Sequence, residues 1–280
     1  KSAWNLHTLY FAHLAVTDIR GQTFTYHERV GRGALGMSGA AADRYRVWIE
    51  DWQARLDGEM HHLQAAAGDA ALDLQLTPTQ PPMSHGDTGV SQKAAGEGFA
   101  SHYYSLTRLA TQGRLTLGGR TLNVQGQSWM DHEFSSSQLA PYQTGWDWFS
   151  LQLDDGCELM LYILRHQDGS LDPFSSGTLV DPQGASRHLK LDEYTVQVLD
   201  TWKSPRSGAV YPGAWKITTQ GYELELRPTV ADQELVTSRS TRITYWEGSV
   251  QVSGQRQGRP VQGQGYVELT GYADALGGKF

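Results

Sequence analysis

The fold of this chain is decided by FAHLAVTDIRGQTFTY, residues 11–26, and by its counterpart WFSLQLDDGCELMLY, residues 148–162. Each stretch shows an alternating strand, a turn with Asp or Gly, and a second alternating strand that ends on Tyr. Two more pairs match in the same order: LQLTPT (74–79) with LELRPT (224–229), and residues 103–129 with residues 245–266. Matching segments in a fixed order indicate duplicated units. Because the period is domain-sized, the pattern predicts two related β domains rather than a solenoid.

Strand signals also dominate the remainder of the chain, and helical periodicity is scarce. Many short strands separated by glycine-bearing turns are typical of a sandwich or barrel. We therefore predict an all-β, internally duplicated protein with two antiparallel barrels. The pattern loosens at FSSSQLAP (134–141), which places the predicted domains at residues 1–136 and 137–280. The polar, glycine-rich segment 84–100 is predicted to be a loop that crosses or closes a pocket.

The composition excludes several classes of protein. The 280 residues carry a net charge of −7 without a basic stripe, which argues against a nucleic-acid partner. A single cysteine, Cys157, rules out an intrachain disulfide. No apolar run approaches the ~20 residues of a membrane-spanning helix, so an integral membrane protein is not expected.

The densest group of polar and aromatic residues lies in WMDHEF (129–134), and GWDWF (145–149) follows it at short range along the chain. Asp131, His132 and Glu133 are consecutive, and together they offer a general acid, a general base and an orienting carboxylate. On a regular strand, Asp131 and Glu133 face one side and His132 the other, whereas at a bulge or strand end all three can converge.

Three tryptophans surround this segment: Trp129, Trp146 and Trp148. Their rings can raise the pKa of a nearby carboxyl group or bind an apolar ligand. Trp146 and Trp148 are two residues apart and are predicted to share one strand face. The structural alternative is that the segment simply closes the first barrel. A Ser–His pair of His132 with the serines at 135–137 is also open, although serine runs usually mark loops. No HxH, HExxH or CxxC motif occurs, so no metal or cofactor is expected.

Several segments together resemble the AttH/carotenoid 1,2-hydratase family of lipocalin-like proteins. They are LYFAHLAVTD (9–18), HYYSLTRLATQGRL (102–115), SWMDHEF (128–134), GWDWFSLQLDDGCELMLYILR (145–165) and the closing YVELTGY (266–272). The resemblance implies two consecutive lipocalin-like barrels and a periplasmic or secreted location. It also implies that a first strand of the N-terminal barrel precedes residue 1.

In the hydratase branch of this family, a His-x-Trp pair and a later Tyr-x-Asp pair are implicated in protonating and hydrating an alkene. His132 matches the first histidine, but Phe134 stands in the Trp position. The best candidate for the second pair is Tyr162, which is followed by Leu164 instead of a carboxylate. The resemblance therefore implies a pocket for a bulky lipophilic ligand near His132 more directly than it implies one reaction.

Three functional hypotheses follow. In the first, a hydratase- or hydrolase-like enzyme uses His132 for proton transfer, with Asp131 or Glu133 orienting it. Its ligand contacts Trp129, Phe134, Trp146, Trp148 and Tyr162. In the second, the protein is a lipid or isoprenoid carrier without turnover. In the third, it is an accessory protein of an envelope transporter complex. The enzyme hypothesis predicts that His132 is more than half buried and hydrogen-bonded to a carboxylate or backbone group.

Overall fold

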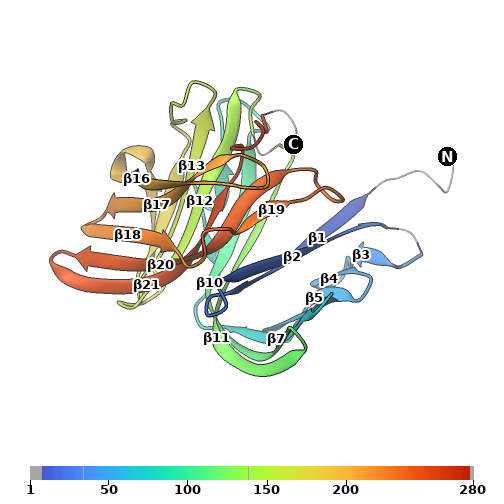
Figure 1. Cartoon of the computed structure of the whole chain (residues 1–280). Helices are drawn as coiled ribbons and strands as arrows, with labels where there is room; N and C mark the ends of the chain where they lie inside the picture. Colours follow the sequence, from blue (N-terminus) through green and yellow to red (C-terminus); the bar gives the residue numbers. More distant parts are fainter. Residues whose placement is uncertain (1–7, 34, 138, 278–280) are drawn as a thin grey trace.

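The computed structural model describes residues 8–33, 35–137 and 139–277, and it confirms the all-β prediction (Figure 1). Within these residues the only helical element is one short 3₁₀ turn, η1 (Leu191–Glu193). No helix long and apolar enough to cross a membrane occurs in the described part of the chain. The strands form one two-stranded hairpin and two large antiparallel sheets.

The hairpin and the first sheet come from the N-terminal half of the chain. The hairpin pairs β1 (Leu9–Asp18) with β2 (Thr23–Arg32). The first sheet has the order β11-β10-β7-β6-β5-β4-β3, and the short strands β8 and β9 also pair with β10. Its strands are β3 (Ser38–Ala40), β4 (Arg46–Ile49), β5 (Trp52–Asp57), β6 (Met60–Ala67), β7 (Ala70–Pro78), β8 (Met83–Ser84), β9 (Val90–Gln92), β10 (Ala100–Leu117) and β11 (Arg120–Ser135).

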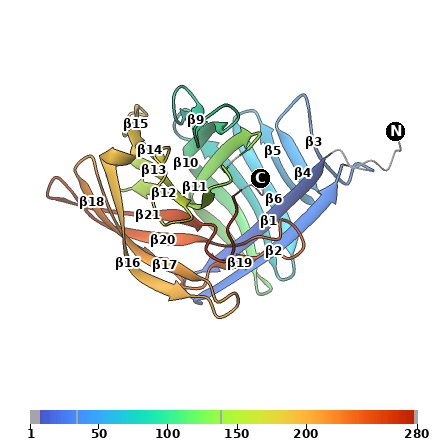
Figure 2. The same cartoon turned by 90° about the horizontal axis from the view of Figure 1, so that it is seen from above.

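The second sheet comes from the C-terminal half. Its order is β15-β14-β13-β12-β21-β20-β18-β17-β16, and β19 pairs with β20. Its strands are β12 (Gln143–Leu153), β13 (Glu158–His166), β14 (Ser176–Val180), β15 (Ser186–Lys190), β16 (Tyr194–Lys203), β17 (Val210–Thr219), β18 (Tyr222–Pro228), β19 (Glu234–Val236), β20 (Thr244–Arg256) and β21 (Arg259–Leu269). Figure 2 shows the two curled sheets next to each other.

The chain passes from the first sheet to the second between Ser135 and Gln143. This passage overlaps the loosened segment 134–141, while the domain limits themselves stay a prediction. The matching segments of the sequence fold alike: β1–β2 and β12–β13 are hairpins, as are β10–β11 and β20–β21. The internal duplication is not confirmed and also stays a prediction.

Strand β13 explains how the two sheets hold together. Its run of apolar residues is buried on both faces, as expected for a strand covered on two sides. Leu159, Leu161 and Ile163 belong to the large core of the second sheet. Met160 and Tyr162 point the other way and pack in a separate cluster with Tyr103 of the first sheet. The burial of β13 therefore depends on both sheets.

A bulge in β10 lets the first sheet form polar contacts with the second. The pairing of β10 with β11 shifts between Leu106 and Leu109, which leaves one extra residue on β10 and bends the strand. At this bulge the carbonyl of Thr107 accepts a hydrogen bond from Nε2 of Gln152 at 2.8 Å. Arg108 reaches the fully buried Glu158, with 2.5 Å between Nε and Oε1. The bulge thus directs two polar groups of the first sheet toward the second.

Candidate functional site

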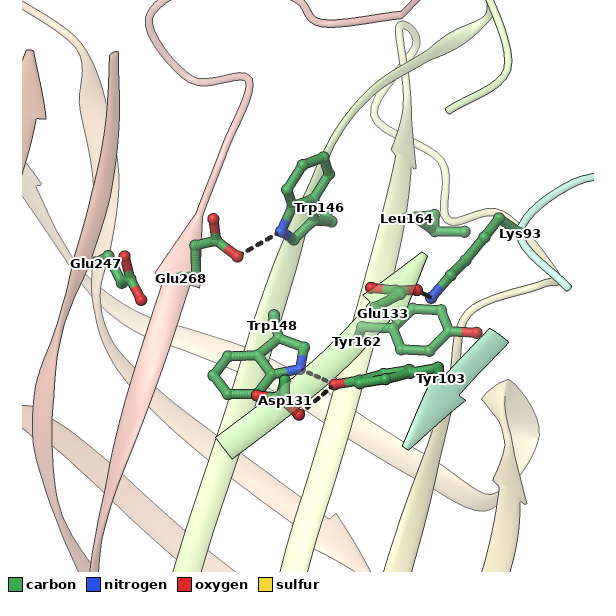
Figure 3. A pocket seen from close by; sticks show the side chains of 10 residues that line it. All are labelled: Lys93, Tyr103, Asp131, Glu133, Trp146, Trp148, Tyr162, Leu164, Glu247 and Glu268. Carbon is green, nitrogen blue, oxygen red and sulfur yellow. Dashed lines mark hydrogen bonds and ion pairs between the residues drawn. The ribbon is translucent and has the colours of Figure 1, made fainter. Parts of the chain in front are cut away.

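A cavity of about 350 Å³ lies between the two sheets. It is enclosed by residues of β10 and β11, of β12 and β13, of β20 and β21, and of the segment after β9 (Figure 3). The lining residues are Lys93, Tyr103, Asp131, Glu133, Trp146, Trp148, Tyr162, Leu164, Glu247 and Glu268. A second cavity of about 510 Å³ adjoins it and shares Asp131, Trp148 and Glu247. The site is therefore a long cleft with an acidic section at one end.

Strand β11 separates the residues that the sequence predicted to act together. Asp131 and Glu133 line the cavity. The ring of His132 lies on the opposite face of the strand, where it stacks on Tyr104 with ring centroids 5.1 Å apart. Within the described residues, the His132 ring makes no hydrogen bond, although most of its surface is buried. His132 therefore does not line this cavity, because β11 keeps its regular alternation here, and its catalytic role stays a prediction.

Phe134 shares the face of His132, and the two rings contact each other edge to face. Its surface is 55% exposed, and it does not line the cavity. The alternation of β11 places Phe134 outside this cavity as it does His132, and a ligand contact of Phe134 stays a prediction. In contrast, Trp146, Trp148 and Tyr162 all line the cavity, and Trp129 lines the adjoining one. The prediction that Trp146 and Trp148 share one strand face is confirmed.

Asp131 is held by three donors that all reach the same oxygen. Its Oδ1 accepts hydrogen bonds from the hydroxyl of Tyr103 at 2.9 Å, from Nε1 of Trp129 at 3.0 Å and from the hydroxyl of Ser105. Nε1 of Trp148 in turn donates to the Tyr103 hydroxyl at 3.0 Å. Burial raises the pKa of Asp131, and these hydrogen bonds act in the opposite direction. Burial beside Asp131 also raises the pKa of Tyr103 well above its usual value, so Tyr103 stays a donor.

Glu133 forms the only ion pair between charged groups of the cavity lining, within the described residues. Nζ of Lys93 lies 3.0 Å from Oε1 of Glu133, and the hydroxyl of Ser101 donates to the same oxygen at 2.5 Å. The ammonium group also lies 3.8 Å from the centre of the Tyr162 ring, within range of a cation–π interaction. Burial lowers the pKa of Lys93, but Tyr162 and Glu133 outweigh that effect and raise it. Lys93 is therefore a permanent cation of the site.

Glu247 and Glu268 form a carboxyl pair on the wall opposite Asp131. They are direct partners in the ladder of β20 and β21, a position at which Cβ atoms are about 4.5–5.5 Å apart. Burial raises the pKa of Glu247 to about 8, with repulsion from Glu268 and Asp131 as the next causes. Burial also raises the pKa of Glu268 to about 7. Near neutral pH this pair therefore retains a proton.

The two members of this pair differ in their hydrogen bonds. Nε1 of Trp146 donates to Oε2 of Glu268 at 2.8 Å, which favours the ionised form of Glu268. No hydrogen bond reaches the Glu247 carboxyl group from the described residues, and Figure 3 shows this group next to Glu268 without a partner drawn to it. Glu247 is therefore the better proton donor of the two.

Sequence reasoning missed Lys93, Tyr103, Glu247 and Glu268. Lys93 lies in the segment 84–100, which was predicted to cross a pocket, but no feature of the sequence marked this lysine. Glu247 and Glu268 are each a single acidic residue in an alternating strand, in YWEGSV (245–250) and YVELTGY (266–272). The available signal was that a hairpin of these two strands would place the two glutamates opposite each other. The described residues contain no cluster of three or more His, Cys, Asp or Glu side chains arranged for a metal ion.

The comparisons with known proteins agree with the fold. The family model described as AttH-like matches residues 1–272. A crystal structure of a protein assigned as AttH from Nitrosomonas europaea superposes with a TM-score of 0.89 at 34% identity, covering 97% of this chain and 84% of that one.

A hydratase is among the relatives as well. The kievitone hydratase of Fusarium solani subsp. phaseoli is 22% identical over 279 residues, which cover 94% of this chain and 75% of that protein. The crystal structure of kievitone hydratase from Nectria haematococca superposes with a TM-score of 0.77 at 20% identity, covering 94% of this chain and 80% of that one. At this level of identity the likeness shows a shared fold alone; the lipocalin-like class predicted from the sequence is supported by the AttH structure.

Proposed function

This chain belongs to the AttH-like family, and from that premise we propose that it is a hydratase-like enzyme. It binds a bulky lipophilic molecule in the cleft between the two sheets and adds water across a carbon–carbon double bond by acid–base catalysis. The observation that carries this proposal is the carboxyl pair of Glu247 and Glu268, which faces Asp131 across an aromatic cavity and keeps a proton near neutral pH.

Hydration needs a strong enough acid close to an apolar group. A carboxyl group whose pKa lies near the working pH is suited to deliver a proton, and Glu247 has no competing hydrogen bond among the described residues. Transfer of its proton to one alkene carbon forms a C–H bond and leaves the other carbon cationic. The faces of Trp146 and Trp148 and the anionic carboxylates stabilise this developing positive charge.

Asp131 completes the reaction on the opposite wall. A water molecule attacks the cationic carbon, and one of its protons passes to Asp131, whose raised pKa makes it a better base than an exposed carboxylate. The proton then returns to Glu247 through solvent, which closes the cycle. Lys93 and Glu133 take no proton in this scheme; their ion pair fixes the end of the cavity next to Tyr162.

The test is turnover in H₂¹⁸O with kievitone as the first probe and with apolar alkenes extracted from host cells as the second. We expect a product heavier than the substrate by one molecule of ¹⁸O-labelled water. Glu247→Gln and Asp131→Asn should each lower the rate by roughly 10²–10⁴-fold while binding changes little. Binding that quenches tryptophan fluorescence without any product would instead support a lipid or isoprenoid carrier.

Location and partners are further proposals that rest on family resemblance. We propose that the protein acts in the periplasm or outside the cell, and that it can associate with an envelope transporter. Fractionation of host cells, followed by detection of this chain in the periplasmic and secreted fractions, tests the location. Cross-linking in intact cells tests the association.

A further inference from the structure

His85 is a buried residue that bridges the two sheets behind the cavity. It lies between β8 and β9, and only 1% of its surface is exposed. Its Nδ1 is 2.8 Å from Oγ1 of Thr178 in β14, and its Nε2 is 2.7 Å from Oγ of Ser105 in β10. The hydroxyl of Ser105 then contacts Oδ1 of Asp131. A continuous chain of hydrogen bonds thus runs from the second sheet to the carboxylate in the cavity.

Only one assignment of donors and acceptors fits this series of hydrogen bonds. Oδ1 of Asp131 already accepts hydrogen bonds from Tyr103 and Trp129, so it carries no proton of its own and Ser105 must donate to it. Because a hydroxyl has one proton, Ser105 must accept from Nε2–H of His85. In a neutral ring Nδ1 is then unprotonated and accepts from the hydroxyl of Thr178.

Electrostatics keeps the His85 ring neutral. Burial, in the first place, and the charges of Lys93 and His188 lower the pKa of His85 to about 3. A neutral ring with fixed partners does not move protons at ordinary pH, and it does not line the cavity. Its chemical contribution is therefore the orientation of its neighbours.

We propose that His85 is a positioning residue for Asp131: its Nε2–H fixes the Ser105 hydroxyl, and Ser105 holds the carboxylate with Oδ2 left to the cavity. This inference rests on the proposed role of Asp131 as the base, and it adds a residue from outside the cavity. It also links the base to the packing of the two sheets, since Thr178 belongs to one sheet and Ser105 to the other.

The first measurement is made on the wild-type protein and needs no substrate. In ¹⁵N-histidine-labelled protein, long-range ¹H–¹⁵N spectra distinguish the two neutral tautomers of a histidine ring. We expect the His85 signal, assigned by its absence in His85→Gln, to show Nε2 protonated and Nδ1 bare from pH 5 to pH 9. A ring protonated on Nδ1, or one that titrates in this range, would overturn the proposal.

The second measurement follows the carboxyl group of Asp131 by ¹³C NMR, with Asp131→Asn for assignment. The charges that face it, on Glu133, Glu247 and Glu268, are unchanged in all variants. His85→Leu removes the donor to Ser105, so the Asp131 pKa should rise by about one unit. His85→Gln keeps an amide donor of similar reach and should restore most of the wild-type value.

A double-variant cycle separates positioning from a general structural effect. If His85 acts through Ser105, His85→Leu should shift the Asp131 pKa in the wild-type background and hardly at all in the Ser105→Ala background. Equal shifts in both backgrounds would reject the proposal. These outcomes are independent of turnover: if no probe is hydrated, the proposed function fails while the tautomer and the cycle still decide the role of His85.

Discussion

Glu247 and Glu268 face each other across one hairpin, and two carboxylates at that separation are costly to ionise together. Their pKa values lie above the ordinary value of 4.5, so the folded protein binds more protons than the unfolded chain between about pH 4.5 and pH 8. Because the folded state binds more protons than the unfolded state, the free energy of unfolding falls as the pH rises through that window. The pair is therefore a feature that lowers stability at alkaline pH, as is often found at functional sites.

Replacing Glu247 tests this conclusion without any substrate. Glu247→Gln removes the repulsion, so it should raise the free energy of unfolding at pH 9 by roughly 1–3 kcal/mol. At pH 5 both carboxyl groups are largely protonated, and the variant should differ little from the wild type. Urea unfolding at both pH values measures the effect. Glu223→Gln is the matched control, because Lys216 lowers the pKa of the exposed Glu223 and no gain at pH 9 is expected there. Equal effects of Glu247→Gln at both pH values would contradict the assignment.

At the scale of the element, β11 shows how a regular strand sorts its side chains. The residues of WMDHEF alternate, so Trp129, Asp131 and Glu133 face the second sheet while His132 and Phe134 face away from it. The only register shift of the β10–β11 pair lies further along, between Leu106 and Leu109. A bulge next to His132 would have turned its ring toward the cavity; with the regular pairing the ring lies behind the strand.

This arrangement predicts a contrast between adjacent residues. His132→Gln should change turnover by no more than about threefold, because the ring lies behind the strand, whereas Asp131→Asn should lower it by roughly 10²–10⁴-fold. Product formation measured by chromatography for both variants, with tryptophan fluorescence for binding, makes the comparison. A large loss in His132→Gln with intact folding would return the histidine to the catalytic site.

At the scale of the whole molecule, the cavity exists because two curled sheets meet along β10–β11 and β12–β13. The ion pair of Arg108 and Glu158 crosses this contact, and Glu158 is fully buried. Burial raises the pKa of Glu158 although Arg108 opposes the shift. A buried carboxylate that loses its partner is strongly destabilising, while a pair replaced as a whole by apolar residues is often nearly neutral.

Variants of this pair therefore test how the sheets are held together. Arg108→Leu should lower the free energy of unfolding by about 3 kcal/mol, and the double variant Arg108→Leu, Glu158→Leu should recover most of that loss. Lys216→Ala breaks an exposed pair with Glu223 and should cost no more than about 1 kcal/mol. Urea titrations of the three variants give the comparison; a double variant as unstable as Arg108→Leu alone would show that the loss has another cause.

The sequence by itself determined the local features of this protein. Alternation with period two is a property of neighbouring residues, so it predicted the strands, the glycine turns, the all-β class and the shared face of Trp146 and Trp148. It also brought out Asp131 and Glu133, because charged residues in an aromatic strand are unusual. The segment 84–100 was predicted to be a loop that crosses or closes a pocket; it supplies Lys93 to the cavity, but it also contains β9, which pairs with β10.

Only the tertiary structure decided which of these residues act together. The direction of His132 depended on whether β11 contained a bulge, and the residues flanking it allowed either outcome. The cavity joins Asp131 to Tyr103, Trp148 and the pair of Glu247 and Glu268, which come from strands far apart in the chain. The raised pKa values of Asp131, Glu247 and Glu268 arise first from burial between the two sheets, and that of Glu247 also from repulsion by Glu268 across a hairpin. Both causes depend on distances in space, which the order of residues along the chain does not contain.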